Sequence, residues 1–185
     1  MTRVAVVTGA ASGMGEAIAR HLAHAGEAVA LFDLDETIGL MVEHGTFLVP
    51  TSYLAEGLDI SMAAPELQAK AAEVFPQAKQ MLGRAIKAGV KIACGTDAPA
   101  VPHGKNAKEL WAMCDRGMTP MQALQAATMT SADLINRSHD LGRLEAGYLA
   151  DIIAVPGDPS ADITMTEDVR FVMKDGTVYK GETAQ

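Results

Sequence analysis

A glycine-rich turn near the start of the chain contains residue types that can bind a phosphate group. These residues are Gly9, Ser12, Gly13 and Gly15. Glycines at this spacing let the backbone turn tightly and approach a pyrophosphate, and a helix that begins there directs free N–H groups toward the anion. Asp33, at the end of the next apolar segment, could accept hydrogen bonds from an adenosine ribose. The alternative is a turn that only caps a helix.

Residues 1–35 resemble the beginning of the short-chain dehydrogenase/reductase family, through Thr8-Gly9-x-x-x-Gly13-x-Gly15 and the later Asp33. The resemblance implies a Rossmann-like βαβ segment, and the acidic residue implies NAD rather than NADP. That family carries its chemistry on a Ser and a Tyr-x-x-x-Lys pair. No tyrosine of this chain is followed by Lys four residues later. We therefore expect weak NAD binding at most, without dehydrogenase activity.

The rest of the chain resembles the end of the amidohydrolase superfamily, nearest to its imidazolonepropionase-like and dipeptidase-like members. Four segments carry this resemblance: residues 35–51, 89–104, 117–128 and 141–176. They are similar to the seventh strand with its preceding helix, the eighth strand with its loop, the final barrel helix and the small β-domain. The resemblance implies a TIM-barrel fragment from a hydrolase, so the chain as a whole looks like a chimera of two families.

In that superfamily an Asp on the last strand binds a divalent metal and takes the proton from the attacking water. Asp97, in Gly95-Thr96-Asp97, matches this position, and His103 follows closely enough to bind the same metal or orient a substrate. A metal lowers the pKa of bound water and polarises the electrophile. The resemblance therefore implies a divalent metal, zinc in the first place. The ligand set is incomplete, because no His-x-His occurs, and His103 could also be an ordinary loop histidine.

Three further histidines are weaker candidates for metal binding. His44 precedes the strand expected at 46–50, which places it at the end opposite Asp97, and we expect it at a helix end or on the surface. His21 and His24 lie three residues apart on one expected helix, a spacing that can share a metal. Solvent-facing histidines at that spacing are commoner.

The elements that must position these residues alternate between strand and helix, which is typical of a parallel sheet covered by helices. The expected strands are 4–8, 28–33, 46–50 and 90–95, and the expected helices are 14–25, 35–44, 65–88, 106–115 and 119–135. Because the carboxyl ends of parallel strands meet at one edge, Gly9, Gly13, Asp33, Thr51 and Asp97 should share one face of the sheet.

After residue 136 the pattern changes to short alternating strands at 150–155 and 169–173, followed by the hairpin turn Asp175-Gly176. The expected fold class is therefore α/β, an open Rossmann-like or half-barrel sheet of about four parallel strands with a small antiparallel β appendage. Residues 1–35 and 36–136 would form one fold, and residues 137–185 the appendage.

The composition narrows the range of partners. A formal net charge of -8 and the absence of a basic run disfavour nucleic acid. Two cysteines cannot build a disulfide framework, and no apolar run is long enough to cross a membrane. A cytoplasmic protein with a small-molecule substrate is expected. The tail strands lack the partners that they would have in the superfamily, so a homodimer or larger homo-oligomer is also expected.

Three functions remain open from the sequence. The first is a promiscuous metal-dependent hydrolase of activated esters, lactones or phosphotriesters that uses Asp97 and His103. The second is an NAD-binding module without turnover. The third is a folded chimera without a selected function.

Overall fold

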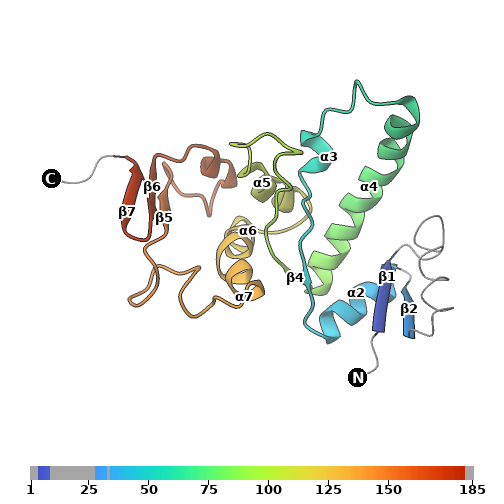
Figure 1. Ribbon diagram of the computed structural model, residues 1–185, viewed down its shortest axis with the longest axis horizontal. Helices are drawn as coiled ribbons and strands as arrows, with labels where there is room; N and C mark the ends of the chain where they lie inside the picture. Colours follow the sequence, from blue (N-terminus) through green and yellow to red (C-terminus); the bar gives the residue numbers. More distant parts are fainter. Residues whose placement is uncertain (1–3, 9–27, 33, 182–185) are drawn as a thin grey trace.

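The computed structural model describes residues 4–8, 28–32 and 34–181 of the chain. Within these residues the molecule is elongated (Figure 1). The strands β1 (Val4–Thr8) and β2 (Ala28–Phe32) lie at one end, and a three-stranded sheet lies at the other. β1 and β2 pair in parallel, with Val4 opposite Ala28. Both strands fall where the apolar runs predicted them.

A second parallel pair lies near the middle of the molecule. It consists of β3 (Phe47–Leu48) and β4 (Lys91–Ile92), with Phe47 opposite Lys91. The connection between them contains the short helix α3 (Leu54–Gly57) and the long helix α4 (Pro65–Ala88). Helix α2 (Leu34–Glu43) precedes β3. The sequence predicted one sheet of four parallel strands. That prediction is wrong for the described residues, because the four strands form two separate pairs.

Local chemistry explains the ends of α4. Pro65 occupies the first turn, where its missing N–H has no intrahelical partner to lose. Gly89 ends the helix in the left-handed conformation at φ 85°, which costs glycine little. Its N–H bonds back to the carbonyl of Ile86 at 3.1 Å. The predicted helix 65–88 is confirmed residue for residue.

The next helices pack beside β4. They are α5 (Lys108–Asp115), α6 (Pro120–Gln125), the π-helical turn η1 (Ala126–Thr130) and α7 (Ser131–Leu134). Residues 119–135 were predicted as one helix, and the structure confirms the segment but interrupts it with the π turn. At its start the Thr119 hydroxyl accepts from the N–H of Gln122 while the Gln122 side chain accepts from the N–H of Thr119.

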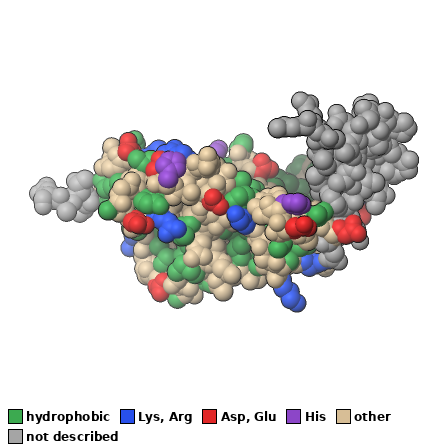
Figure 2. Space-filling model, turned by 90° about the horizontal axis from the view of Figure 1, so that it is seen from below, with side chains coloured by type: hydrophobic (Ala, Val, Ile, Leu, Met, Phe, Trp, Pro, Cys, Tyr) green, Lys and Arg blue, Asp and Glu red, His purple; other side chains and the backbone are tan. Residues whose placement is uncertain are grey.

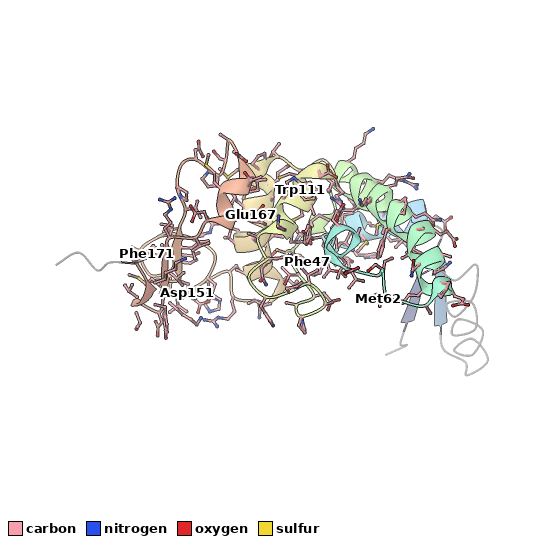
Figure 3. All side chains as sticks on the ribbon, turned by 90° about the horizontal axis from the view of Figure 1, so that it is seen from above. Phe47, Met62, Trp111, Asp151, Glu167 and Phe171 are labelled. Carbon is pink, nitrogen blue, oxygen red and sulfur yellow. The ribbon has the colours of Figure 1, made fainter. Side chains whose placement is uncertain are left out.

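The C-terminal sheet is antiparallel, as the sequence predicted. Its strand order is β5 (Ile152–Ala154), β6 (Phe171–Lys174) and β7 (Thr177–Lys180), and the 3-10 helix η2 (Ile163–Glu167) connects the first two. Asp175 and Gly176 both have positive φ, 47° and 73°, as the two central residues of a tight hairpin require. Figure 3 shows Glu167 of η2 close to α5, where it pairs with Lys108 at 3.0 Å.

The core of the described residues gathers between α4, β4, α5 and α6. Its members are apolar and almost fully buried: Leu82, Ala85, Val90, Ile92, Leu110, Met113, Ala123 and Ala126. On the face seen in Figure 2, hydrophobic side chains are interspersed with charged ones. No helix among the described residues combines the length and the apolar character needed to cross a membrane.

Candidate functional site

The carboxyl ends of β3 and β4 lie side by side and form the candidate site. The ladder continues past the assigned strands, since the N–H of Ala93 donates to the carbonyl of Leu48 at 3.0 Å. Each strand then leads into a non-glycine residue with left-handed backbone, Thr51 at φ 43° and Asp97 at φ 48°. L-residues seldom adopt this conformation, and it gathers at functional sites. Asp tolerates it better than most residues do.

Gly95 lets the two strand ends approach closely. A Cβ atom at this position would stand 2.4 Å from Cγ1 of Val49 and 3.4 Å from Cγ2 of Thr51. The first distance is shorter than any real carbon contact, so a larger residue would push the strand ends apart. The glycine of the Gly95-Thr96-Asp97 run is therefore explained by packing within the site.

The Asp97 loop is held by local hydrogen bonds. The N–H of Ala100 donates to the carbonyl of Asp97 at 2.8 Å. Asn106 links the two ends of the loop, because its Nδ2 donates to Oγ1 of Thr96 at 3.2 Å and its Oδ1 accepts from the N–H of Gly104 at 3.2 Å. The loop thus has a defined shape on either side of the exposed Asp97 and His103.

Asp97 and His103 lie on one loop at the predicted end of the sheet, and both side chains are exposed. Across the described ranges, no three His, Cys, Asp or Glu side chains are grouped closely enough to hold a metal ion. These two residues therefore do not form a complete metal centre with other described residues. A metal would require further donors.

Cys94 immediately precedes Gly95 and is hydrogen-bonded to η1 and to the first residue after it. Its N–H donates to the Ser131 hydroxyl at 3.1 Å and to the carbonyl of Ala126 at 3.3 Å. The Ser131 hydroxyl in turn donates to the same carbonyl at 2.7 Å. Burial, aided by the nearby Glu109 carboxylate, raises the pKa of the Cys94 thiol to about 11. This shift disfavours the thiolate, the form of cysteine that acts as a nucleophile.

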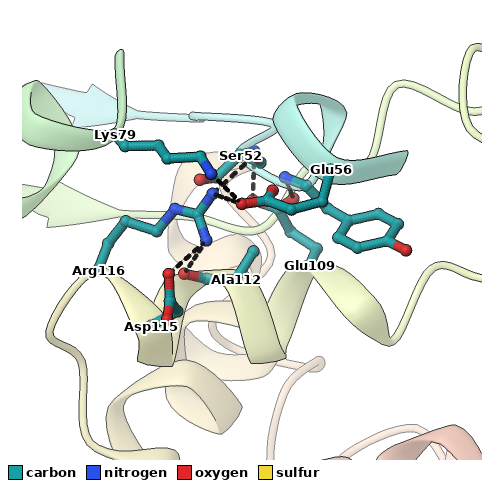
Figure 4. Close-up of polar contacts among 8 residues, drawn as sticks. Ser52, Glu56, Lys79, Glu109, Ala112, Asp115 and Arg116 are labelled. Carbon is teal, nitrogen blue, oxygen red and sulfur yellow. Dashed lines mark hydrogen bonds and ion pairs between the residues drawn. The ribbon is translucent and has the colours of Figure 1, made fainter. Parts of the chain in front are cut away.

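A buried carboxylate holds the loop that follows β3 (Figure 4). Glu109 of α5 is 1% exposed, and its two oxygens accept from the N–H groups of Ser52 and Tyr53, each at 2.7 Å. Burial raises the pKa of Glu109 and outweighs the opposing effect of these hydrogen bonds and of nearby Arg116.

Arg116 follows Glu109 on the same face of the helix and is also buried. Its Nη2 donates to Oε1 of Glu56 at 2.6 Å, and its Nη1 donates to the carbonyl of Ala112 at 3.2 Å. Lys79 of α4 reaches the same Glu56 oxygen at 2.5 Å. Burial opposes ionisation of Glu56, but the hydrogen bonds from Lys79 and Arg116 prevail and lower its pKa.

Sequence reasoning did not identify Glu109 and Arg116, although a signal was present. Both occupy a helix stripe with Ala112 and Met113 at spacings of three, four and seven residues, and the two apolar members are fully buried. Charged residues at the ends of such a stripe indicate buried ionic contacts.

Two hollows adjoin the candidate site. The smaller, about 10 Å³ and thus room for roughly one water molecule, is bordered by Tyr53, Thr96, Asn106 and Glu109. The larger, about 180 Å³, lies between α4 and the loop after β3, and Leu54, Phe75 and Lys79 help to line it. The Tyr53 ring packs edge-on against Trp111, with ring centroids 6.4 Å apart.

The remaining predicted site residues lie elsewhere. His44 is exposed just beyond the end of α2 and before β3, so the prediction of a surface histidine at the opposite strand end is confirmed. The proposed dinucleotide site and the paired histidines fall outside the described residues. These are Gly9, Ser12, Gly13, Gly15, His21, His24 and Asp33.

Comparison with known proteins shows which family the chain resembles. The profile of the Amidohydrolase family matches residues 7–181. The solved structure of a Xaa-Pro dipeptidase with bound methionine aligns with 96% of this chain and 54% of its own, at a TM-score of 0.76 and 36% identity. Ochratoxinase of Aspergillus niger is 42% identical over 102 residues, which make up 52% of this chain and 21% of the relative.

An uncharacterized protein of Mycobacterium tuberculosis is 33% identical over 130 residues, 68% of this chain and 34% of that protein. The matches therefore span about a fifth to a third of these curated relatives. Because the family match begins at residue 7, it includes most of the segment that resembles a short-chain dehydrogenase, and the comparisons do not support a chimera. From residue 7 to residue 181, the chain belongs to the amidohydrolase family.

Proposed function

We propose that the chain carries the last-strand part of a hydrolase active site, with Asp97 as the residue that accepts a proton from the attacking water. The observation that carries the proposal is the backbone of Asp97, which is held at φ 48° at the carboxyl end of β4. An Asp with this seldom-adopted backbone, just after a strand of an amidohydrolase-family chain, supports a role in chemistry. Its side chain is exposed and accessible to a substrate.

The reaction is attack of water on an electrophilic carbon or phosphorus. The water oxygen forms the new bond, Asp97 takes the water proton, and the bond to the leaving group breaks as that group receives a proton. His103, on the same exposed loop, orients the substrate or supplies a second donor to a metal. Because Asp97 and His103 are both exposed, a substrate is held loosely beside them. We therefore expect slow turnover with broad specificity.

A divalent metal would complete the site that we propose. Asp97 and His103 offer the oxygen and nitrogen donors that a divalent ion such as zinc takes, and when bound it would activate water and polarise the electrophile. Its other donors would have to come from outside the described residues. NAD binding carries no proposal, because the family match includes most of the segment on which that expectation was based.

The substrate class is a compound with an activated leaving group. Activated esters, lactones and phosphotriesters need the least precise positioning, so they are the first compounds to test. The names of the relatives, a Xaa-Pro dipeptidase and an ochratoxinase, add Xaa-Pro dipeptides and ochratoxin to the panel of compounds to test.

The test compares two matched variants. Asp97→Asn removes the carboxylate but keeps a side chain that tolerates the left-handed conformation. Asp175→Asn makes the same change at another exposed residue with nearly the same backbone, φ 47°, in the β6–β7 turn. We expect Asp97→Asn to lower kcat/KM about a thousandfold or more, and Asp175→Asn to leave it unchanged. Metal content and activity are measured before and after chelation.

The results separate the proposals. Equal activity of Asp97→Asn and wild type would place the site elsewhere. Full activity after complete removal of metal would end the metal proposal but leave the role of Asp97 intact. No hydrolysis of any compound by the wild-type chain would favour a folded chain without this activity.

A further inference from the structure

The loop after β3 is capped by a side chain that is distant in the sequence. Helix α3 begins at Leu54, and no local side chain caps it. The N–H groups of the first three helical residues bond to the carbonyls of residues 51–53, so the donors that need a partner are those just before the helix. Here the carboxylate of Glu109 accepts from Ser52 and Tyr53, 57 and 56 residues away along the chain.

Arg116 strengthens the same attachment. It lies two helical turns beyond Glu109, and its side chain is 2% exposed. The guanidinium donates to Glu56 at the far end of α3 and approaches the carbonyl of Ser52 at 3.5 Å. The beginning and the end of residues 52–56 are thus both fixed to one face of α5.

This loop packs directly against the segment that carries Asp97. A Cβ atom at Gly57 would stand 3.1 Å from Cγ2 of Val101, and one at Gly95 would stand 3.4 Å from Cγ2 of Thr51. Tyr53 of the loop also borders a common hollow with Thr96. A movement of residues 51–57 would therefore be transmitted to the residues on both sides of Asp97.

We propose that Glu109 is a positioning residue. Its carboxylate fixes the loop after β3 through the hydrogen bonds that it accepts from Ser52 and Tyr53, here called the cap, and thereby holds the backbone of Asp97 in its reactive conformation. The role in catalysis rests on the proposed function of Asp97. The cap itself does not, and it can be measured without any substrate.

The first experiment measures amide hydrogen exchange at Ser52 and Tyr53 in wild type, Glu109→Gln and the control Glu145→Gln, which alters an exposed glutamate. The amide of Gln presents one acceptor oxygen where Glu has two, so at least one N–H loses its partner. We expect these amides to exchange about tenfold faster or more in Glu109→Gln. Unchanged exchange would overturn the cap.

Trp111 provides an independent signal, because it is the only tryptophan of the chain and packs on Tyr53. Its fluorescence should shift to longer wavelength in Glu109→Gln as the Tyr53 ring moves away, and it should stay constant in Glu145→Gln. If Glu109→Gln does not fold, Glu109→Asp keeps the charge on a shorter side chain. In Glu109→Asp, exchange of the Ser52 and Tyr53 amides at a rate between that of wild type and a roughly tenfold faster one supports the cap. Exchange at the wild-type rate overturns it.

The second experiment measures kinetics on the best substrate of the panel. A mispositioned Asp97 lowers kcat on the order of tenfold to a hundredfold and leaves KM nearly unchanged. Faster exchange with an unchanged kcat would overturn the positioning role while the cap stands. A wild-type chain without hydrolysis would overturn the proposed function and the positioning role together, and the exchange measurement would still decide the cap.

Discussion

Arg116 is a buried, charged residue, and only some of its side-chain nitrogen atoms have a hydrogen-bond partner among the described residues. Its Nη1 and Nη2 atoms have partners, whereas Nε has none among the described residues. A buried charge is costly unless it is paired, and the loss of one partner usually exposes that cost. Glu56 and Arg116 should therefore contribute to stability as a pair.

Replacing Arg116 by Met tests this contribution through its pH dependence. Glu56 keeps Lys79 as a partner and is partly exposed, so the loss at pH 7 should be smaller than the roughly 3–5 kcal/mol of a fully buried pair. The folded-state pKa of Glu56 is lowered. Its stabilisation is therefore present above the unfolded pKa and is lost as pH falls through the folded value.

The difference in free energy of unfolding between wild type and Arg116→Met should thus shrink as pH falls from 7 to below the ordinary glutamate range. Urea denaturation at a series of pH values measures it. Arg170→Met is the control, since Arg170 pairs with Asp168 on the surface. A difference that grows in acid would contradict the assignment.

At the scale of elements, the start of α6 combines two reciprocal hydrogen bonds with a proline in the first turn. Thr119→Ala removes the hydroxyl that accepts from Gln122, and such a change costs about 1 kcal/mol. Thr128→Ala is a fitting control, because its hydroxyl donates only to the carbonyl of Leu124 within the helical run. Equal midpoints of urea unfolding for the two variants would show that the capping box contributes little.

The helices were more predictable than the sheets. Pro65 and Gly89 mark the ends of α4 in the sequence itself, so its bounds were found. The strands at 46–50 and 90–95 shorten to two residues each, with one further hydrogen bond from Ala93 to Leu48, because their apolar runs extend beyond the residues that form the ladder. How the four parallel strands divide into two pairs depends on packing between distant segments, which periodicity does not encode.

The candidate site was predictable only in part. The position of Asp97 just after a strand agrees with the sequence, in which residue type, glycine spacing and family resemblance point to the same place, whereas its role in a site stays a prediction. The contacts of Glu109 with Ser52 and Tyr53 join residues more than fifty positions apart. The sequence of α5 does not indicate which distant loop its polar residues contact. Only the spacing of Glu109 and Arg116 around the apolar Ala112 and Met113 indicates that the two charged residues are buried.

At the scale of the whole molecule, the C-terminal sheet has two edge strands. Among the described residues, β5 and β7 each pair only with β6. Ile153 of β5 and Tyr179 of β7 are 59% and 72% exposed. Exposed apolar side chains beside an open strand edge favour association with another chain, so we propose that the protein forms a homodimer or larger homo-oligomer through this sheet.

Light scattering at micromolar concentration tests this proposal. Ile153→Lys should shift the protein toward the monomer, because a charge on an edge strand opposes pairing. Ile135→Lys is matched in exposure, 60%, but lies at the end of α7, and it should leave the assembly unchanged. A monomeric wild-type chain would rule out the proposal.

The π turn η1 determines which one-residue change in length the chain can absorb between the Thr119 cap and Ser131. A π turn accommodates about one more residue than an α-helical turn does. Deleting a single residue from 126–130 would let the run continue as a regular helix. Because the π turn absorbs that extra residue, the phase of α7 would change little, and the Ser131 hydroxyl would still face the N–H of Cys94 from which it now accepts. Homologous chains that retain this contact should therefore tolerate the loss of one residue within η1 more readily than the loss of one residue within α6, which would rotate α7 by about 100°.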